Sequence, residues 1–186
     1  MPLKYKSLKH NSLKSLALAS VILAASSVSA MAHEYTIRIT NMLSDELLAP
    51  VVLVAARADK HIFDGNYVTR EAEEQILTGD PGKLVDRIGR KANVVHGTDG
   101  PPGVLLAPGK SVEVTVKARH NSGLRILAMV APTMKPDHFV SVVIDPSTML
   151  PATMDRYDIG YDEGRKSIQY VSSGAAKVEI VSMMDH

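Results

Sequence analysis

This chain of 186 residues contains no cysteine, which excludes several kinds of protein and site. Without cysteine the chain has no disulfide bond, no zinc site built on thiolate ligands and no lipobox cysteine to carry a lipid anchor. A stable fold must therefore rest on a hydrophobic core. A domain of about 150 residues buries enough apolar surface to provide one.

Long apolar runs are also missing, apart from a short one near the amino terminus. The first 32 residues begin with a basic region that has no acid, followed by the apolar core LALASVILAA over residues 16–25. This core is too short to span a bilayer, and small residues follow it up to Ala30-Met31-Ala32. The pattern predicts a secretory signal peptide over residues 1–32, with an uncleaved anchor as the alternative. We therefore expect a periplasmic or secreted protein.

An excess of positive charge is the third feature that the predicted mature chain, residues 33–186, lacks. The leader removes four of the 21 lysines and arginines and none of the 20 acids, which leaves 17 against 20 and a net charge of −3. The isoelectric point near 8.0 belongs to the precursor. No basic stripe remains along the sequence, so we expect no nucleic-acid partner. No later segment reaches the length of a membrane span.

Most of the mature sequence has the pattern of β-strands. Residues 35–40 (YTIRIT) and 111–118 (SVEVTVKA) alternate apolar and polar side chains, which predicts strands with one buried face. Residues 49–56 (APVVLVAA) form a continuous apolar run, typical of a strand buried on both faces or of a sheet edge under a loop. Further strands are predicted over residues 124–131, 139–144 and 176–182.

One region departs from the strand pattern. Thr69 precedes a run with acids in its first turn, REAEEQIL, which predicts a helix with Thr69 as its N-cap. Residues 79–82 interrupt this helix, and residues 83–91 predict a second short one. The predicted fold is therefore a single all-β domain, an antiparallel β-sandwich with a short helical insertion around residues 69–91.

A loop between two predicted strands carries an acid-histidine pair, Asp137-His138. Pro132 and Pro136 stiffen this loop, which we expect at one end of the sandwich, where such folds place binding sites. The pair could be a ligand site, a catalytic dyad or the tip of a turn. Adjacent residues of a strand point to opposite faces, which disfavours the dyad.

Five segments follow one another in the order and with the spacing of a known family. They are YTIRITN (35–41), APVV (49–52), LAPGKSV (106–112), MVAPT with DHFV (129–133 and 137–140), and YDIGYD (157–162). Together they resemble the spondin amino-terminal domain, the module found in F-spondin, in mindin and in many exported bacterial proteins. The last two segments are similar to the family's Asp-Trp-Phe-Val-Gly and Tyr-Asp-Ala-Gly-Thr-Asp/Glu signatures.

The resemblance implies a C2-like β-sandwich that acts in binding and adhesion, with a calcium site at one end of the sandwich in animal members. Three positions depart from the family pattern. His138 stands where the family has tryptophan, Ser141 where it has glycine, and Val143 where an acid often follows. Animal members also carry cysteines, and this chain has none.

Calcium prefers six to eight oxygen ligands, mostly carboxylates and carbonyls. Asp137, Asp158 and Asp162 are the residues that we expect to hold calcium if the two signature loops converge, and Glu163 lies beside them. We expect His138 to be a partly buried packing residue that adds no ligand. In the alternative interpretation Asp158 caps a turn through its side chain and Asp162 is solvated.

A second hypothesis starts from His33, the predicted mature amino terminus. Its amine and imidazole can bind copper, with a second histidine completing the site. The candidates for this second histidine are His61, His96, His120 and His138.

Motifs of enzymes are absent from the sequence. It has no Gly-x-Ser-x-Gly elbow, no phosphate-binding loop with its trailing Ser or Thr, and no metalloprotease His-Glu-x-x-His motif. The predicted function is therefore that of an exported, non-enzymatic protein that binds a periplasmic or extracellular ligand, with a possible calcium site. A periplasmic copper-binding protein is the alternative.

Overall fold

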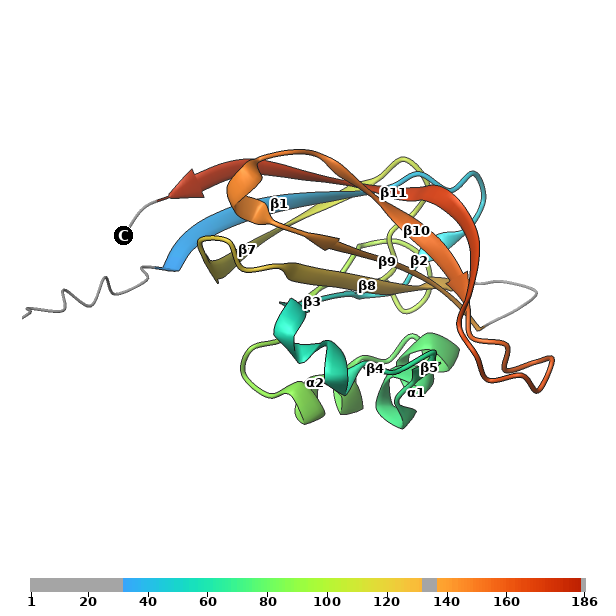
Figure 1. Cartoon of the computed structure of the whole chain (residues 1–186). Coiled ribbons are helices and arrows are strands. Elements are labelled where there is room, and N and C mark those ends of the chain that lie inside the picture. Colours follow the sequence, from blue (N-terminus) through green and yellow to red (C-terminus); the bar gives the residue numbers. More distant parts are fainter. Residues whose placement is uncertain (1–31, 132–136, 185–186) are drawn as a thin grey trace, which may run out of the picture.

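The computed structural model describes residues 32–131 and 137–184. Over these residues the main feature is a nine-stranded antiparallel sheet (Figure 1). Its strands are β1 (Ala32–Asn41), β2 (Leu47–Leu48), β3 (Val51–Ala55), β6 (Asn93–Val95), β7 (Ser111–Arg119), β8 (Leu124–Ala131), β9 (His138–Ile144), β10 (Ala152–Asp158) and β11 (Gln169–Met184). The predicted leader, up to residue 31, and the loop prolines Pro132 and Pro136 lie outside the described residues.

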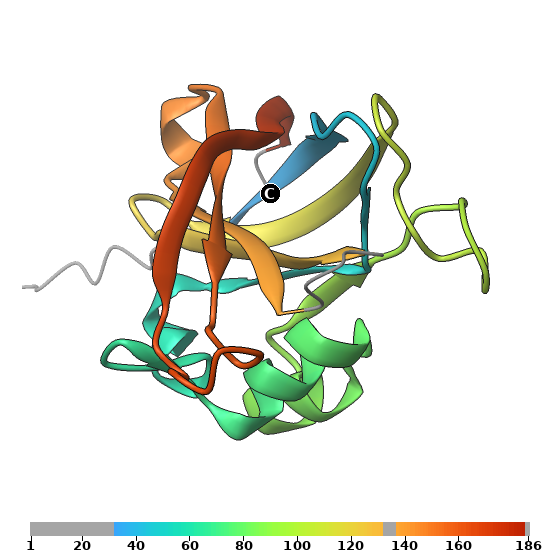
Figure 2. The same ribbon diagram turned by 90° about the vertical axis from the view of Figure 1, so that its right-hand side faces the viewer.

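The sheet curls on itself. Its strand order is β6-β3-β8-β9-β10-β11-β1-β7, with β2 paired to β8, and the two end strands β6 and β7 contact each other. The predicted all-β antiparallel fold with a small helical insertion is confirmed. The view along the strands in Figure 2 shows the curled sheet, with the helices gathered on one side of it.

Apolar and polar residues alternate along β1, so one of its faces points to the inner, concave side of the curled sheet. Tyr35, Ile37 and Ile39 are fully buried, and the residues between them are only partly covered. β1 pairs with β11 on one side and with β7 on the other. The buried side chains of β7 are Val116 and Ala118, in the strand whose alternation is clearest in the sequence. These residues form part of the larger hydrophobic core.

The apolar run of β3 is buried on both faces, which was one of the two expectations for it. Val51 and Leu53 pack into the core inside the curl, whereas Val52 and Val54 pack into a second core on the outer face. β8 divides in the same way, since Ile126 belongs to the inner core and Leu127 to the outer one. A continuous apolar run is the pattern that such two-sided burial requires.

The helical insertion covers this outer face. It consists of the 3-10 turn η1 (Ala56–His61), the hairpin β4 (Phe63–Asp64) with β5 (Tyr67–Val68), and the helices α1 (Arg70–Thr78) and α2 (Gly82–Ile88). Thr69 is the N-cap of α1 as predicted, but its hydroxyl donates to the His61 carbonyl at 2.7 Å and caps no helical N–H. α1 ends at Gly79, whose φ of 77° lies in the left-handed region.

Several features of the sheet were not predicted, among them the two-residue strand β2. Strand β10 was missed, because its segment ATMDRYD has no clean alternation, and the short β6 was missed as well. β11 (Gln169–Met184) is much longer than the predicted 176–182. Its amino-terminal half was missed because Ser172-Ser173-Gly174 interrupts the apolar pattern. Asp158 accordingly lies at the end of a strand, whereas we had placed it on a loop.

Ile76 gives a test of whether the helical insertion is part of the folded unit. It is fully buried in the outer core, so Ile76→Ala should lower the free energy of unfolding by about 2–5 kcal/mol in urea denaturation. Val181→Ala, at a position that is 38% exposed, is the control and should change it by less than about 0.5 kcal/mol. Equal, small effects would mean that the helices are not part of the cooperative core.

Candidate functional site

The candidate site lies at the end of the sheet where β9 begins and β10 ends. His138 and Asp158 are directly opposite each other in the antiparallel register of these strands. The Ile159 amide donates to the Asp137 carbonyl at 3.2 Å, which joins the two signature segments beyond the strand ends. Ligand atoms of Asp137, His138 and Asp158 all lie within 4.8 Å of one another. The structure thus brings together the loops that we expected to converge.

Asp137 is the centre of this arrangement. Its side chain is only 1% exposed. Oδ2 accepts hydrogen bonds from the amides of Tyr161 at 3.0 Å and Asp162 at 3.4 Å, whereas Oδ1 has no hydrogen-bond partner among the described residues. A buried carboxylate oxygen without a partner is unfavourable, because the hydration that it loses on folding is not replaced.

Asp158 has both carboxylate oxygens engaged by the protein. The Gly160 amide donates to Oδ1, and Arg165 Nη2 donates to Oδ2 at 3.0 Å. Gly160 has a φ of 66°, and a Cβ at this position would approach the Arg165 side chain to 3.0 Å. Asp158 therefore shapes the turn that follows β10, which agrees with the alternative interpretation of this residue.

Two exposed acids complete a second group around Asp137. Ligand atoms of Asp137, Asp162 and Glu163 lie within 4.8 Å of one another. The pKa of Asp162 is raised, first by desolvation, then by a hydrogen bond with Glu163 and by the charge of Asp137. Three carboxylates so close together repel one another unless a proton or a cation separates them.

Arg165 balances part of this negative charge. Its Nη2 donates to Glu163 at 2.9 Å as well as to Asp158. Burial alone would lower the pKa of Arg165, but the hydrogen bonds and charges of Glu163 and Asp158 outweigh it and raise the pKa above its ordinary value. The amides of Arg165 and Lys166 also donate to the Gly160 carbonyl, which closes the loop.

His138 lies beside Asp137 and Asp158 and also contacts an arginine. It is 9% exposed, and Nδ1 accepts from Arg156 Nε at 2.9 Å. Arg156 in turn pairs with Glu46 through Nη1 at 2.6 Å and Nη2 at 3.0 Å. An Nδ1 that accepts is unprotonated, so the proton of a neutral ring is on Nε2. We predicted a partly buried His138; in the structure this residue is buried and is held in place by an arginine.

Sequence reasoning missed the cations of this end of the sheet. Arg165 lies seven residues from Asp158 and could have been noticed from its proximity. Arg156 and Glu46 are 110 residues apart, and only the fold brings them together.

The histidines of the copper hypothesis lie on several elements. His33 on β1 and His120 just beyond β7 have ring centres 6.2 Å apart, at the opposite end of the sheet from Asp137. His61 ends η1, and His96 follows β6.

Comparisons of the chain with family models, with curated proteins and with solved structures found no match. Among the helices of the described residues, none combines the length and the apolar character needed to cross a bilayer.

The raised pKa of Asp162 predicts how the stability of the metal-free protein depends on pH. Folded protein binds this proton more tightly than unfolded protein, so stability falls as the pH rises above the ordinary value of 3.8. In chelator, Asp162→Asn should therefore raise the Tm relative to wild type at pH 7, by a difference that vanishes near about pH 4. Thermal melts across this range measure the effect.

The control for this prediction is Asp64→Asn, at the exposed last residue of β4. It should leave the Tm close to that of wild type at both pH values. A lower Tm of Asp162→Asn at pH 7 would show that the acid is net stabilising in the metal-free state and would contradict the prediction.

Proposed function

We propose that this protein is an exported, non-enzymatic binding protein of the spondin type that holds a divalent cation, calcium, at the end of its sheet. The observation that carries the proposal is the buried Oδ1 of Asp137, which has no partner among the described residues. Asp137 belongs to a group of carboxylates, with Asp162 and Glu163, whose ligand atoms lie within 4.8 Å of one another.

The geometry favours calcium because of ligand type and spacing. Oxygens bound to one calcium ion at 2.3–2.6 Å lie no more than roughly 5 Å apart, which the group of Asp137, Asp162 and Glu163 satisfies. All three offer hard carboxylate oxygens, and water or backbone carbonyls would complete the coordination. Besides desolvation and the hydrogen bond with Glu163, the negative charge of Asp137 raises the pKa of Asp162, and a cation here would relieve this repulsion.

Asp158 has a supporting role in this proposal. Because its oxygens already accept from Gly160 and Arg165, we assign it to positioning the loop that carries Asp162 and Glu163. The resemblance to spondin domains supports the location, since both signature segments contribute to this end of the sheet. The adhesive ligand would then bind outside the cytoplasm.

The calcium site predicts a ligand-dependent rise in Tm. A ligand that binds only the folded state adds about 2.7 kcal/mol to its stability at a hundredfold excess over Kd. Calcium should therefore raise the Tm of wild type, and Asp137→Asn should abolish this rise while the metal-free variant keeps the wild-type circular dichroism spectrum. Asp64→Asn is the matched control and should keep the full response.

Two results would contradict this proposal. One is a wild-type Tm that does not change in millimolar calcium. The other is an undiminished rise in the folded Asp137→Asn variant.

The distance between His33 and His120 supports a second candidate function, copper binding. Two imidazoles that bind one metal at about 2 Å have ring centres no more than roughly 6.5 Å apart, and 6.2 Å meets this limit. Cleavage after Ala32 would add the amine of His33 as a further nitrogen ligand. This candidate therefore depends on the leader being removed.

Sequencing the amino terminus of exported protein should give His33, or Met31 if cleavage follows Ala30. For the His33 form, copper(II) titration followed by electron paramagnetic resonance should show coupling to several nitrogens. His120→Ala should weaken copper binding, and His61→Ala, its control, should not. An intact Met1, or equal copper binding by both variants, would eliminate this candidate.

A further inference from the structure

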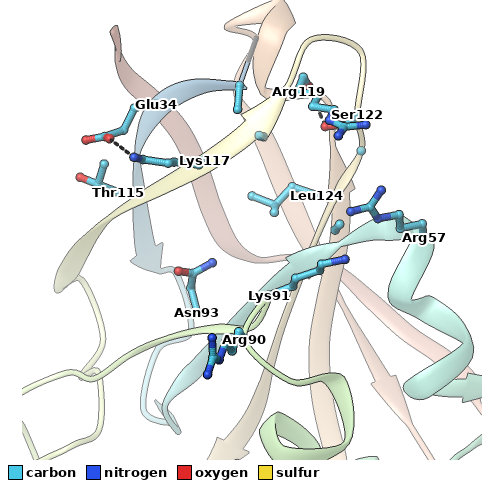
Figure 3. Close-up of a pocket in the computed structure, with 14 residues that line it drawn as sticks. Glu34, Arg57, Arg90, Lys91, Asn93, Thr115, Lys117, Arg119, Ser122 and Leu124 are labelled. Carbon is cyan, nitrogen blue, oxygen red and sulfur yellow. Dashed lines mark hydrogen bonds and ion pairs between the residues drawn. The ribbon is translucent and has the colours of Figure 1, made fainter. Parts of the chain in front are cut away.

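A cavity of about 760 Å³ lies at the end of the sheet opposite Asp137 (Figure 3). It lies between the two edges of the curled sheet, where no strand pairing among the described residues joins them, and we call it the groove. β6 pairs only with Val51, Val52 and Leu53 of β3, so the last residues of β3 have no partner strand on that side within residues 32–131 and 137–184. The outer edge of β7 is likewise unpaired there, and the cavity lies between these two edges.

Five cations from separate segments surround this cavity. They are Arg57 of η1, Arg90 and Lys91 after α2, and Lys117 and Arg119 of β7. Figure 3 shows Arg57, Arg90 and Lys91 along one wall and Lys117 and Arg119 along the other. Among the described residues that line it, Glu34 is the only acid, and it pairs with Lys117 at 3.8 Å. This concentration of charge is invisible in the sequence because its members are far apart.

Most cations of this groove form no ion pair with the described residues, unlike most other cations in the fold. Elsewhere in the described part of the chain, most arginines and lysines are matched with acids, as in the pairs Arg38–Glu113, Lys83–Glu74, Arg87–Glu71, Arg125–Asp59, Arg156–Glu46 and Lys177–Glu179. Arg57, Arg90, Lys91 and Arg119 form no ion pair within the described part of the chain. Unmatched cations on two facing walls attract an anion between them.

The floor of the groove is apolar and made of small side chains. Ala55, Ala118 and Leu124 line it, and Asn93 and Thr115 add uncharged polar groups. An apolar floor of this kind is compatible with the C–H face of a sugar ring, and amide and hydroxyl side chains in the lining are the types that bond sugar hydroxyls. None of the lining residues within 32–131 and 137–184 is an aromatic on which a nucleic-acid base could stack. A recessed groove between two walls also fits a chain better than the flat surface of a membrane.

We propose that this groove binds a segment of an acidic polysaccharide, with carboxylate or sulfate groups meeting the cations of the two walls. Arginine pairs with such groups through two parallel hydrogen bonds, which Arg57 and Arg119 offer from opposite sides. This site is independent of the calcium site, and its binding requires no metal.

Isothermal titration calorimetry at low salt and in chelator tests this inference. The probes are an oligogalacturonate and a dextran sulfate, and their uncharged counterparts are the methyl-esterified oligogalacturonate and dextran. We expect the acidic probes to bind and the uncharged ones not to bind. Because exposed ion contacts are screened, binding should also weaken as salt is added.

A pair of matched double variants tests the location. Arg57→Gln with Arg119→Gln should weaken binding by at least about tenfold, which corresponds to roughly 0.7 kcal/mol per contact. Arg70→Gln with Lys110→Gln removes the same charge at exposed positions outside the groove and should weaken it less than about twofold. Circular dichroism confirms that each variant is folded.

Several results would overturn the proposal. These are no binding of either acidic probe, equal binding of the uncharged counterparts, or equal weakening by both double variants. Equal binding of a decathymidylate would show that the groove responds to charge alone. Binding of phosphatidylglycerol vesicles without binding of the oligosaccharides would assign the cations to a membrane surface instead.

Discussion

The fold depends on a middle layer of strands that is buried on both faces. β3 and β8 direct alternate side chains into the core inside the curl and into the core beneath the helices. Phe139 of β9 joins the outer core and stacks on Tyr157 of β10 with ring centres 5.2 Å apart. Apolar burial is the main favourable term in folding, so this shared layer fixes the positions of both the curled sheet and the helical insertion.

The two ends of this layer carry opposite charges for different physical reasons. At one end, backbone amides and Arg165 hold acids closer together than their mutual repulsion would otherwise allow. At the other end, the short β6 leaves two strand edges apart, and cations line the resulting groove. The curled sheet therefore brings together the loops of Asp137 and Asp162 at one end, and at the other end it leaves the edges of β3 and β7 apart.

The sequence predicts the parts of the fold that periodicity controls. The alternation in residues 35–40 and 111–118 and the apolar run from residue 49 locate β1, β7 and β3, and the acids after Thr69 locate α1. β10 has no such signal, because Asp155 and Arg156 interrupt its apolar positions and the strand contains bulges in its pairing with β11. Strand registers and the closure of the sheet involve residues far apart in the chain, which periodicity does not report.

The acidic residues of the candidate site could be named from the sequence, but their distances and contacts could not. Asp137, Asp158 and Asp162 could be named from the two signature segments, because carboxylates on adjacent loops are the simplest sign of a cation site. The distinct roles of Asp137 and Asp158 depend on which oxygens the backbone and Arg165 occupy. Those contacts follow from the antiparallel register of β9 and β10, which the sequence does not specify locally.

The position of β11 in the sheet has a consequence for the order in which the chain can fold. Its first half pairs with β10 and its second half with β1, so it joins the two parts of the sheet. β1 is synthesised more than a hundred residues before this partner, and closing so long a loop opposes early pairing. Until residues 169–184 have been synthesised, the emerging chain thus lacks the strand that joins the two parts of its sheet. Before that strand is available, β1 and β10 lack the neighbour that lies between them, and the sheet stays open.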